Sequence, residues 1–238
     1  MRPIPAMAAL FALGCLQAGM VQARSLEISP IMVTFAPGQT ATTIELKNRD
    51  EAPVAIQARP YRWTQAGDED TLTPTQELIL SPPIFTVPAG ASQTMRLLLR
   101  GGAVGGEERS YRLLLDEVPP ANTRSRQIEI ALRVSLPVMV ASASSAPAAL
   151  RWRAGRGPGG ETQLSVINSG TAYAHVNMIE VTLADGSHPK AVPRGANPYI
   201  LPGATRDWIV QGRAGPPGPL QLKVLPQSGQ SEQTLTAP

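Results

Sequence analysis

The chain has 238 residues and a formal net charge of +3, and its composition limits the kinds of protein it can be. So small a positive charge does not imply electrostatic attraction to nucleic acid. Aromatic residues make up only 4% of the chain, which is too few for a base-stacking platform. Proline and glycine are abundant, with 24 and 21 residues, and strand-like runs recur between turn signals. This pattern is typical of an all-β chain.

The first residues have the pattern of an export signal. Arg2 supplies a positive start, and residues 7–16 form an apolar run that is too short to span a bilayer. Val21-Gln22-Ala23 is a small-residue cleavage site. We therefore expect cleavage after Ala23, with residues 1–23 removed and the mature chain outside the cytoplasm.

The single cysteine of the chain, Cys15, lies inside this signal. The residues before it bear some similarity to a lipoprotein cleavage box, so lipidation of Cys15 is the alternative to simple cleavage. With the signal removed, the chain has no cysteine, which excludes disulfides, thiol nucleophiles and zinc–thiolate sites.

Short alternating runs follow one another through the first half of the chain, separated by Pro, Gly and Asn turn signals. The expected strands are 26–28, 32–35, 42–47, 54–63 with an interruption at Pro60, 79–87, 94–100 and 110–118. Residues 65–75 are polar and acidic and are expected to form a surface loop. The number and spacing of these strands match an immunoglobulin-like β-sandwich.

The most regular alternation lies in residues 127–140, QIEIALRVSLPVMV. Every second residue is aliphatic, which predicts a strand with one continuous apolar face. Pro137 cannot donate to a ladder, so its part of the strand should lie at a sheet edge or a bend. A long apolar edge is normally an aggregation hazard. Two interpretations follow: a core strand of a sandwich, or a strand kept available for another chain.

A compositional break at residues 141–149, ASASSAPAA, indicates a linker. Beyond it, shorter strands are expected at 150–153, 163–168, 174–184, 205–210 and 220–225. They predict a second, smaller β-sandwich. The expected organisation is a signal peptide (1–23), a first domain (24–140), a linker (141–149) and a second domain (150–238).

No group of residues has the spacing of a catalytic, metal or cofactor site. Asp185, Ser187 and His188 belong to one tight turn, in which a nucleophile–base chain cannot form. His175 is more simply explained as a strand residue than as a metal ligand, because a metal site needs partners. The glycine-rich residues 101–106 lack the ending of a phosphate-binding loop. We expect no enzymatic activity.

Three segments in order carry a family resemblance: LEISPIMVTF from Leu26, Pro-Ala-Gly-x-x-x-Thr-Met-Arg from Pro88, and YRLLLDEVPP from Tyr111 before the alternating strand. This arrangement resembles the periplasmic pilus-assembly chaperones of the chaperone–usher pathway. The resemblance implies two immunoglobulin-like sandwiches in an L-shaped arrangement with an interdomain cleft. It implies pilin subunits and an outer-membrane usher as partners, and neither a nucleic acid nor a small-molecule substrate.

The resemblance also implies a use for the alternating strand. A chaperone of this family inserts its strand into the groove of a pilin that lacks its own last strand. By position, the inserted residues are Ile128, Ile130, Leu132 and, at the end of the series, Val134. Leu136 and Val138 would then belong to the chaperone's own core.

The chain departs from the family at the basic pair that holds the client's terminal carboxylate. Met32 and Pro137 occupy those positions, and neither can bind a carboxylate. The replacement expected first is Arg112, on the strand that should pair with the donor strand, followed by Arg100. Arg133 and Arg59 are weaker candidates, and a solvated surface arginine is the alternative for each.

The patterns LLLDEVPP and SLPV resemble the archaic, spore-coat-type branch of the family. The alternative function is a secreted two-sandwich adhesin or carbohydrate-binding module. Such a protein would share the fold, but it would have no use for an aliphatic edge strand and would be expected to expose more aromatic residues. An extracytoplasmic enzyme explains the sequence least well.

Overall fold

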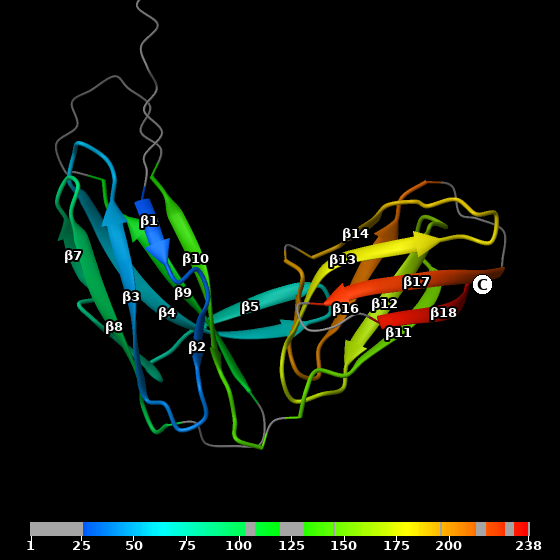
Figure 1. The fold of residues 1–238 in the computed structure, drawn as a ribbon, viewed down its shortest axis with the longest axis horizontal. Coiled ribbons are helices and arrows are strands. Elements are labelled where there is room, and N and C mark those ends of the chain that lie inside the picture. The colour runs from blue at the N-terminus through cyan, green and yellow to red at the C-terminus, as the bar shows by residue number, and fades with distance from the viewer. Residues whose placement is uncertain are drawn as a thin grey trace, which may run out of the picture.

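The computed structural model describes residues 26–102, 108–119, 131–144, 146–195, 197–212, 218–226 and 231–237. The regular structure in these residues is β throughout, and the strands form four sheets. None of the described segments is a helix long and apolar enough to cross a membrane. The sheets make two sandwich-like domains, on the left and right of Figure 1, as the sequence predicts.

Two sheets make up the first domain. One has the strand order β1–β3–β8–β6 and the other β2–β10–β9–β4–β5, with β7 paired to β4. The strands are β1 Leu26–Ser29, β2 Val33–Phe35, β3 Ala41–Asn48, β4 Val54–Ala66, β5 Glu69–Pro74, β6 Leu78–Ser81, β7 Ile84–Val87, β8 Ser92–Leu99, β9 Arg109–Glu117 and β10 Arg133–Val140.

Two further sheets make up the second domain, with the orders β11–β12–β16–β14 and β15–β13–β17–β18. The strands are β11 Leu150–Arg156, β12 Thr162–Asn168, β13 Ala174–Thr182, β14 Ala191–Pro193, β15 Tyr199–Ile200, β16 Thr205–Val210, β17 Gly218–Pro226 and β18 Ser231–Ala237.

Alternation along the strands decides which side chains fill the first core. On β9, Leu113 and Leu115 point into it, and Leu136 and Val138 of β10 lie beside them. Leu136 is 4% exposed and Val138 is fully buried, as the family resemblance implies for these two residues.

The expected loop at residues 65–75 is wrong, because most of it is a strand. β5 pairs antiparallel with the second half of β4, from Tyr61↔Pro74 to Ala66↔Glu69. All six residues of β5 are exposed, so it has no apolar alternation from which a strand could be predicted. We call residues 61–74 the arm, because this hairpin extends from the first domain to the second (Figure 1).

The expected interruption at Pro60 is also wrong, since β4 continues through it. On one side, Pro60 is the register partner of Leu113 on β9. On the other side, β4 changes partner here, from β7 before Pro60 to β5 after it. A residue without an N–H group is tolerated where no ladder partner needs it.

The described part of the alternating strand is β10. Ile128 and Ile130 lie outside the described residues, and Leu132 immediately precedes β10. Residues 133–137 of β10 pair with β9 alone, whereas parallel pairing with β2 begins at Val138↔Val33. Pro137 therefore occupies an edge position, as its missing N–H group predicts.

Candidate functional site

One face of the sheet β2–β10–β9–β4–β5 is turned away from the first core and toward the second domain. It carries Trp63 and Arg59 from β4, Arg112 and Asp116 from β9, and Met139 from β10. Trp63 and Met139 are buried within the hydrophobic cluster of the second domain. We call this surface, defined by these five residues, the interdomain face.

Arg112 lies at the centre of the interdomain face, between aromatic rings of both domains. Its guanidinium carbon is 3.8 Å from the ring centroid of Trp63 and 5.3 Å from that of Tyr199. The two rings meet edge to face with centroids 5.5 Å apart. Burial lowers the pKa of Arg112, although the negative charge of Asp70 opposes the shift. Arginine nevertheless keeps its charge in proteins, so the site holds a partly desolvated cation.

Among the residues that the structure describes this cation forms no ion pair, although the charge of Asp70 acts on it from a distance. The ion pairs within those residues engage Arg49, Arg59, Arg62, Arg109, Arg133, Arg206 and Lys223. Arg112 instead has the faces of two aromatic rings, which attract a cation without neutralising it. A client carboxylate could therefore bind here without displacing an internal partner.

The two positions at which the resemblance expects a basic pair lie next to Arg112. Pro137 is its direct register partner across the β10–β9 ladder. The hydroxyls of Tyr173 and Tyr199 donate to the sulfur of Met32 at 3.6 and 3.9 Å. Tyr199 contacts both Met32 and Arg112, and Pro137 pairs with Arg112. The structure therefore brings Met32, Pro137 and Arg112 close together.

Arg59 and Arg133 are on the same side of the sheet but share one carboxylate. Arg59 Nη2 lies 2.5 Å from Asp116 Oδ2, and Arg133 Nε donates to Asp116 Oδ1. Burial alone would raise the pKa of Asp116, but hydrogen bonds from Arg133 and Arg59 outweigh it and the pKa is lowered. The ionised Asp116 thus neutralises much of the positive charge at this end of the face.

Arg100 lies elsewhere. It is exposed and follows β8, which belongs to the opposite sheet. Its backbone N–H donates to Glu77 O at 2.8 Å. The structure does not bring Arg100 to the interdomain face.

The expected inserted residues are only partly within the described chain. Leu132 is 40% exposed, and its backbone exchanges hydrogen bonds with Glu117. Val134 is half-buried and packs against the first core. The role of these residues, and of Ile128 and Ile130 outside the described residues, stays a prediction.

Several buried polar atoms near the domain boundary have no hydrogen-bond partner among the described residues: Trp63 Nε1, Glu108 Oε1, Ser110 Oγ and Arg206 Nη1. Glu108 also joins the two domains, since its backbone N–H donates to Thr171 O at 2.9 Å. Burial raises the pKa of Glu108 to about 7, although a backbone hydrogen bond from Tyr173 opposes this.

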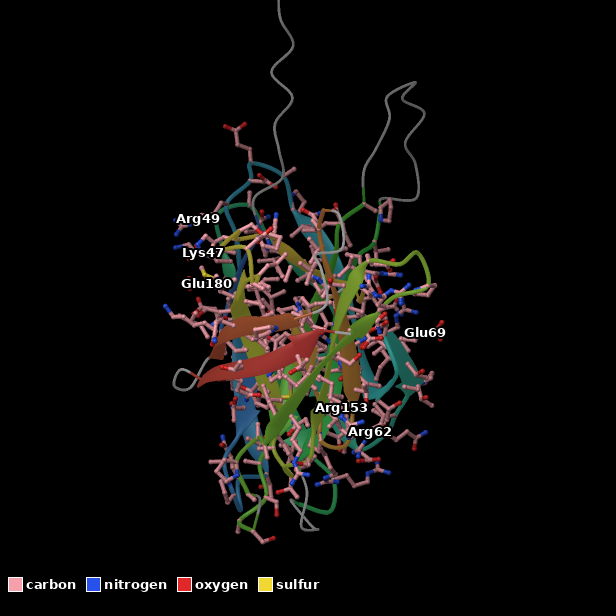
Figure 2. All side chains as sticks on the ribbon, turned by 90° about the vertical axis from the view of Figure 1, so that its right-hand side faces the viewer. Lys47, Arg49, Arg62, Glu69, Arg153 and Glu180 are labelled. Atoms are coloured by element: carbon pink, nitrogen blue, oxygen red, sulfur yellow. The ribbon has the colours of Figure 1, made fainter. Side chains whose placement is uncertain are left out.

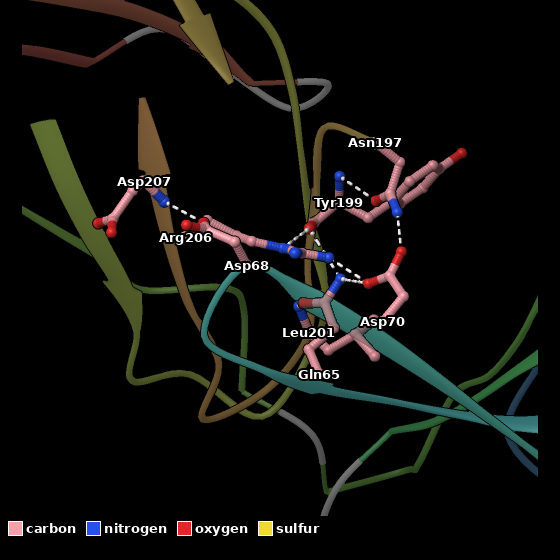
Figure 3. Close-up of polar contacts among 8 residues, drawn as sticks. All are labelled: Gln65, Asp68, Asp70, Asn197, Tyr199, Leu201, Arg206 and Asp207. Atoms are coloured by element: carbon pink, nitrogen blue, oxygen red, sulfur yellow. Dashed lines mark hydrogen bonds and ion pairs between the residues drawn. The ribbon is translucent and has the colours of Figure 1, made fainter. Parts of the chain in front are cut away.

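Sequence reasoning missed the contacts of the arm with the second domain. Residues 65–70 of the arm bind a segment around β15 and β16, as Figure 3 shows. One signal could have pointed to them. Arg206 takes an inward position on an alternating strand, in line with the buried Trp208 and Val210. An arginine on an apolar face needs a buried partner.

A metal site is not formed in the part of the chain that the structure describes, where no three His, Cys, Asp or Glu side chains are grouped to hold an ion. The Asp185 turn is present, with the Ser187 backbone N–H donating to Asp185 Oδ1 at 2.9 Å. His175 is a residue of β13, and its ring packs against that of Tyr199 at a tilt of 55°, with centroids 4.4 Å apart.

Comparisons with known proteins agree with this geometry. Residues 25–145 match the family model described as "Pili and flagellar-assembly chaperone, PapD N-terminal domain". The uncharacterized fimbrial chaperone YhcA of Escherichia coli is 26% identical over 127 residues, which span 53% of this chain and about half of that protein, 53%. The chaperone protein FimB/FhaD of Bordetella pertussis is 28% identical over 183 residues, 71% of this chain and 72% of the relative.

Solved structures share the fold. A chain in the CsuC–CsuE chaperone–tip adhesion subunit pre-assembly complex, from archaic chaperone-usher Csu pili of Acinetobacter baumannii, superposes with a TM-score of 0.69. That match covers 90% of this chain and 99% of the other at 22% identity. The complex of the SafA pilin with the SafB chaperone of Salmonella enterica gives a TM-score of 0.62 at 18% identity, over 90% and 96% of the two chains. With the family model matching across the first domain, the chain belongs to the pili and flagellar-assembly chaperones that carry the PapD-type N-terminal domain.

Proposed function

We propose that the protein is a periplasmic chaperone that binds pilin subunits, caps them by donor-strand complementation and delivers them to an outer-membrane usher. The family is one of chaperones and not of enzymes. The observation that carries the proposal is the half-open edge of β10, where residues 133–137 pair with β9 on one side only. The alternating aliphatic segment leads directly into this edge.

The proposed mechanism needs no chemical step on the client. The free main chain of the donor strand hydrogen-bonds to the pilin, while its aliphatic side chains enter pockets in the pilin groove. Each aliphatic side chain moved from water to such a pocket contributes roughly 1.5–3 kcal/mol. In the proposal these side chains are Ile128, Ile130, Leu132 and Val134.

Arg112 is the proposed anchor for the terminal carboxylate of the client. It is next to Pro137 at the base of the donor strand, and it forms no ion pair among the described residues. Its guanidinium can bind a carboxylate through two parallel hydrogen bonds, which fixes the register of the inserted strand. Arg59 and Arg133 are poorer candidates because Asp116 binds both.

Two finer features belong to the same proposal. The segments LLLDEVPP and SLPV support an assignment to the archaic branch. The signal-like residues 1–23 support export to the periplasm with cleavage after Ala23.

The test is the double substitution Ile130→Asp and Leu132→Asp. Two charges on the inserted face should abolish recovery of the pilin subunit encoded with this chaperone, because each would have to be buried unpaired. The matched control is Ile79→Asp with Leu98→Asp. These two residues are register partners on the opposite sheet with exposures of 40% and 39%, against 40% for Leu132. Wild-type recovery with the first variant, folded as judged by circular dichroism, contradicts donor-strand capture.

A further inference from the structure

Side chains at the tip of the arm form hydrogen bonds with main-chain atoms of the second domain. Gln65 Nε2 donates to Tyr199 O at 3.1 Å, and Leu201 N donates to Gln65 Oε1 at 2.9 Å. A single amide therefore binds the main chain on both sides of Ile200, as a neighbouring strand would. Figure 3 shows these bonds from the arm to β15.

Arg206 is the centre of a second set of contacts. Its side chain is 2% exposed and forms an ion pair with Asp70 of the arm. Its Nε also donates to Tyr199 O at 3.4 Å, and Asp70 accepts from Asn197 Nδ2 (Figure 3). A buried charge is strongly destabilising once its partner is lost, so this pair holds the arm against β16, and the bond from Arg206 to Tyr199 O links both to β15.

The backbone next to Arg206 is packed closely enough to fix the guanidinium. A Cβ atom on Gly195 would lie 2.8 Å from Arg206 Nη1 and 3.1 Å from Asp68 O. Asp68 Oδ1 accepts from Asp207 N at 2.9 Å. The guanidinium thus lies between the arm and the loop before β15.

Both sets of contacts converge on Tyr199, whose ring is the second-domain neighbour of Arg112. We propose that the arm is an interdomain latch that holds the Tyr199 ring against the Arg112 guanidinium. Gln65, Asp70 and Arg206 are then positioning residues of the carboxylate anchor. This inference rests on the proposed function of Arg112.

The physical reason is preorganisation. Between Trp63 and Tyr199 the guanidinium is confined and partly desolvated, and its interaction with a carboxylate is correspondingly stronger. If Tyr199 is displaced, Arg112 gains rotamers and hydration, and part of the binding free energy is spent on ordering it again. The latch therefore affects recognition of the chain end and not insertion of the aliphatic side chains.

This distinction defines the experiment. The probes are two synthetic peptides with the sequence of the C-terminal strand of the pilin recovered with the wild-type protein, one a free acid and the other a C-terminal amide. Their affinities for the full-length chaperone are measured by calorimetry. The ratio of the two affinities reports carboxylate recognition alone, and in the wild type it should be roughly tenfold or more.

Two latch variants are compared, Asp70→Asn and Arg206→Met. The controls are Glu69→Gln, next to Asp70, and Arg153→Met, an arginine of the second domain. Both control side chains are exposed (Figure 2). We expect the latch variants to lower the acid-to-amide ratio at least about fivefold by weakening the acid only, with the controls unchanged.

The outcomes separate the latch from the anchor. If Arg112→Ala leaves the ratio at the wild-type value, the anchor and with it the proposed site are wrong. If Arg112→Ala lowers the acid-to-amide ratio to about one while Asp70→Asn and Arg206→Met keep the wild-type ratio, the latch is wrong and the anchor stands. An equal loss of affinity for both peptides also contradicts the latch, because it indicates general destabilisation. If Arg206→Met fails to fold, the isosteric Asp70→Asn decides, because loss of the Asp70 charge near Arg112 would by itself raise the affinity for the acid and not lower it.

Discussion

At the scale of single residues, the distribution of charge on the interdomain face separates one arginine from the others. Asp116 neutralises Arg59 and Arg133, whereas Arg112 is held by two aromatic rings. A guanidinium that is already in an ion pair has little to gain from a second carboxylate, while a partly desolvated one without an ion pair has more to gain. This difference favours Arg112 over Arg59 and Arg133 as the proposed anchor for a terminal carboxylate.

Arg112→Ala should weaken retention of the pilin subunit about tenfold or more, since hydrogen bonds to charged groups contribute roughly 1.5–3 kcal/mol. Loss of its contact with Trp63 should lower the free energy of unfolding by no more than about 2 kcal/mol. Arg100→Ala, exposed on the other sheet, is the control. The dissociation rates of the chaperone–pilin complexes check the first expectation, and urea unfolding of the free chaperones checks the second. Equal dissociation rates would remove Arg112 from the site.

Glu108 predicts a pH dependence of stability. Its pKa is raised from 4.5 to about 7 by burial, so the folded state binds a proton that the unfolded state releases. Its contribution to stability is therefore lost as the pH rises from about 4.5 to about 7. Glu108→Gln should unfold at higher urea concentration than the wild type at pH 8, and this advantage should disappear at pH 4. Glu45→Gln, at an exposed position of β3, controls for removing a carboxylate. A pH-independent difference would contradict the buried carboxyl.

At the scale of elements, strands with a regular apolar alternation were predictable, whereas β5, β14, β15 and β18 were missed. β3 places Ile44 and Leu46, and β8 places Met95, Leu97 and Leu99, at every second position, and these side chains are buried. β5 is exposed on both faces, so its sequence is polar and has no apolar period that would predict a strand. Its pairing with β4 depends on backbone hydrogen bonds, which most residue types can make.

The candidate site was predictable in part for a similar reason. Arg112 interrupts an apolar run and lies on the strand expected to pair with the donor strand, which marks it in the sequence. Trp63 and Tyr199, which define its surroundings, are separated from it by 49 and 87 positions, and no local pattern links them. Contacts between domains depend on the tertiary arrangement, which periodicity does not report.

The turn of the arm gives an element-scale prediction. Gly67 has a φ of +57°, and a Cβ atom there would meet nothing within 4 Å, so the cost of substitution comes from the backbone alone. Gly67→Ala should destabilise the protein by about 1–2 kcal/mol. Gly155 has equal space but no positive φ, so Gly155→Ala is the matched control and should be neutral or stabilising. Thermal unfolding measures both, and equal melting temperatures would contradict the left-handed turn.

At the scale of the whole molecule, the two domains share one boundary cluster. Trp63 and Met139 of the first domain pack among buried residues of the second, and the arm adds polar contacts beside them. A first domain packed in this way against the second can present the proposed donor strand and the proposed Arg112 site in a constant relation. Such a relation suits a client that must be held by its strand and its chain end together.

The compartment is a prediction about the whole chain. Export with cleavage after Ala23 predicts a mature protein that begins at Arg24 and carries no acyl chain. Intact-mass measurement on protein recovered from the periplasmic fraction tests it. A mass that retains residues 1–23, or one that includes a diacylglyceryl group on Cys15, would show that the cleavage prediction is wrong.

The central claim is that residues 127–134 become a strand of the client's fold, and hydrogen–deuterium exchange of the chaperone with and without its pilin measures this directly. Main-chain N–H groups that gain partners in the pilin should be protected in the complex, with the largest gain in peptides covering residues 127–134. Strands β3, β8 and β6, which belong to the opposite sheet, should exchange alike in both states. Unchanged exchange in residues 127–134, with protection gained elsewhere, would contradict donor-strand complementation.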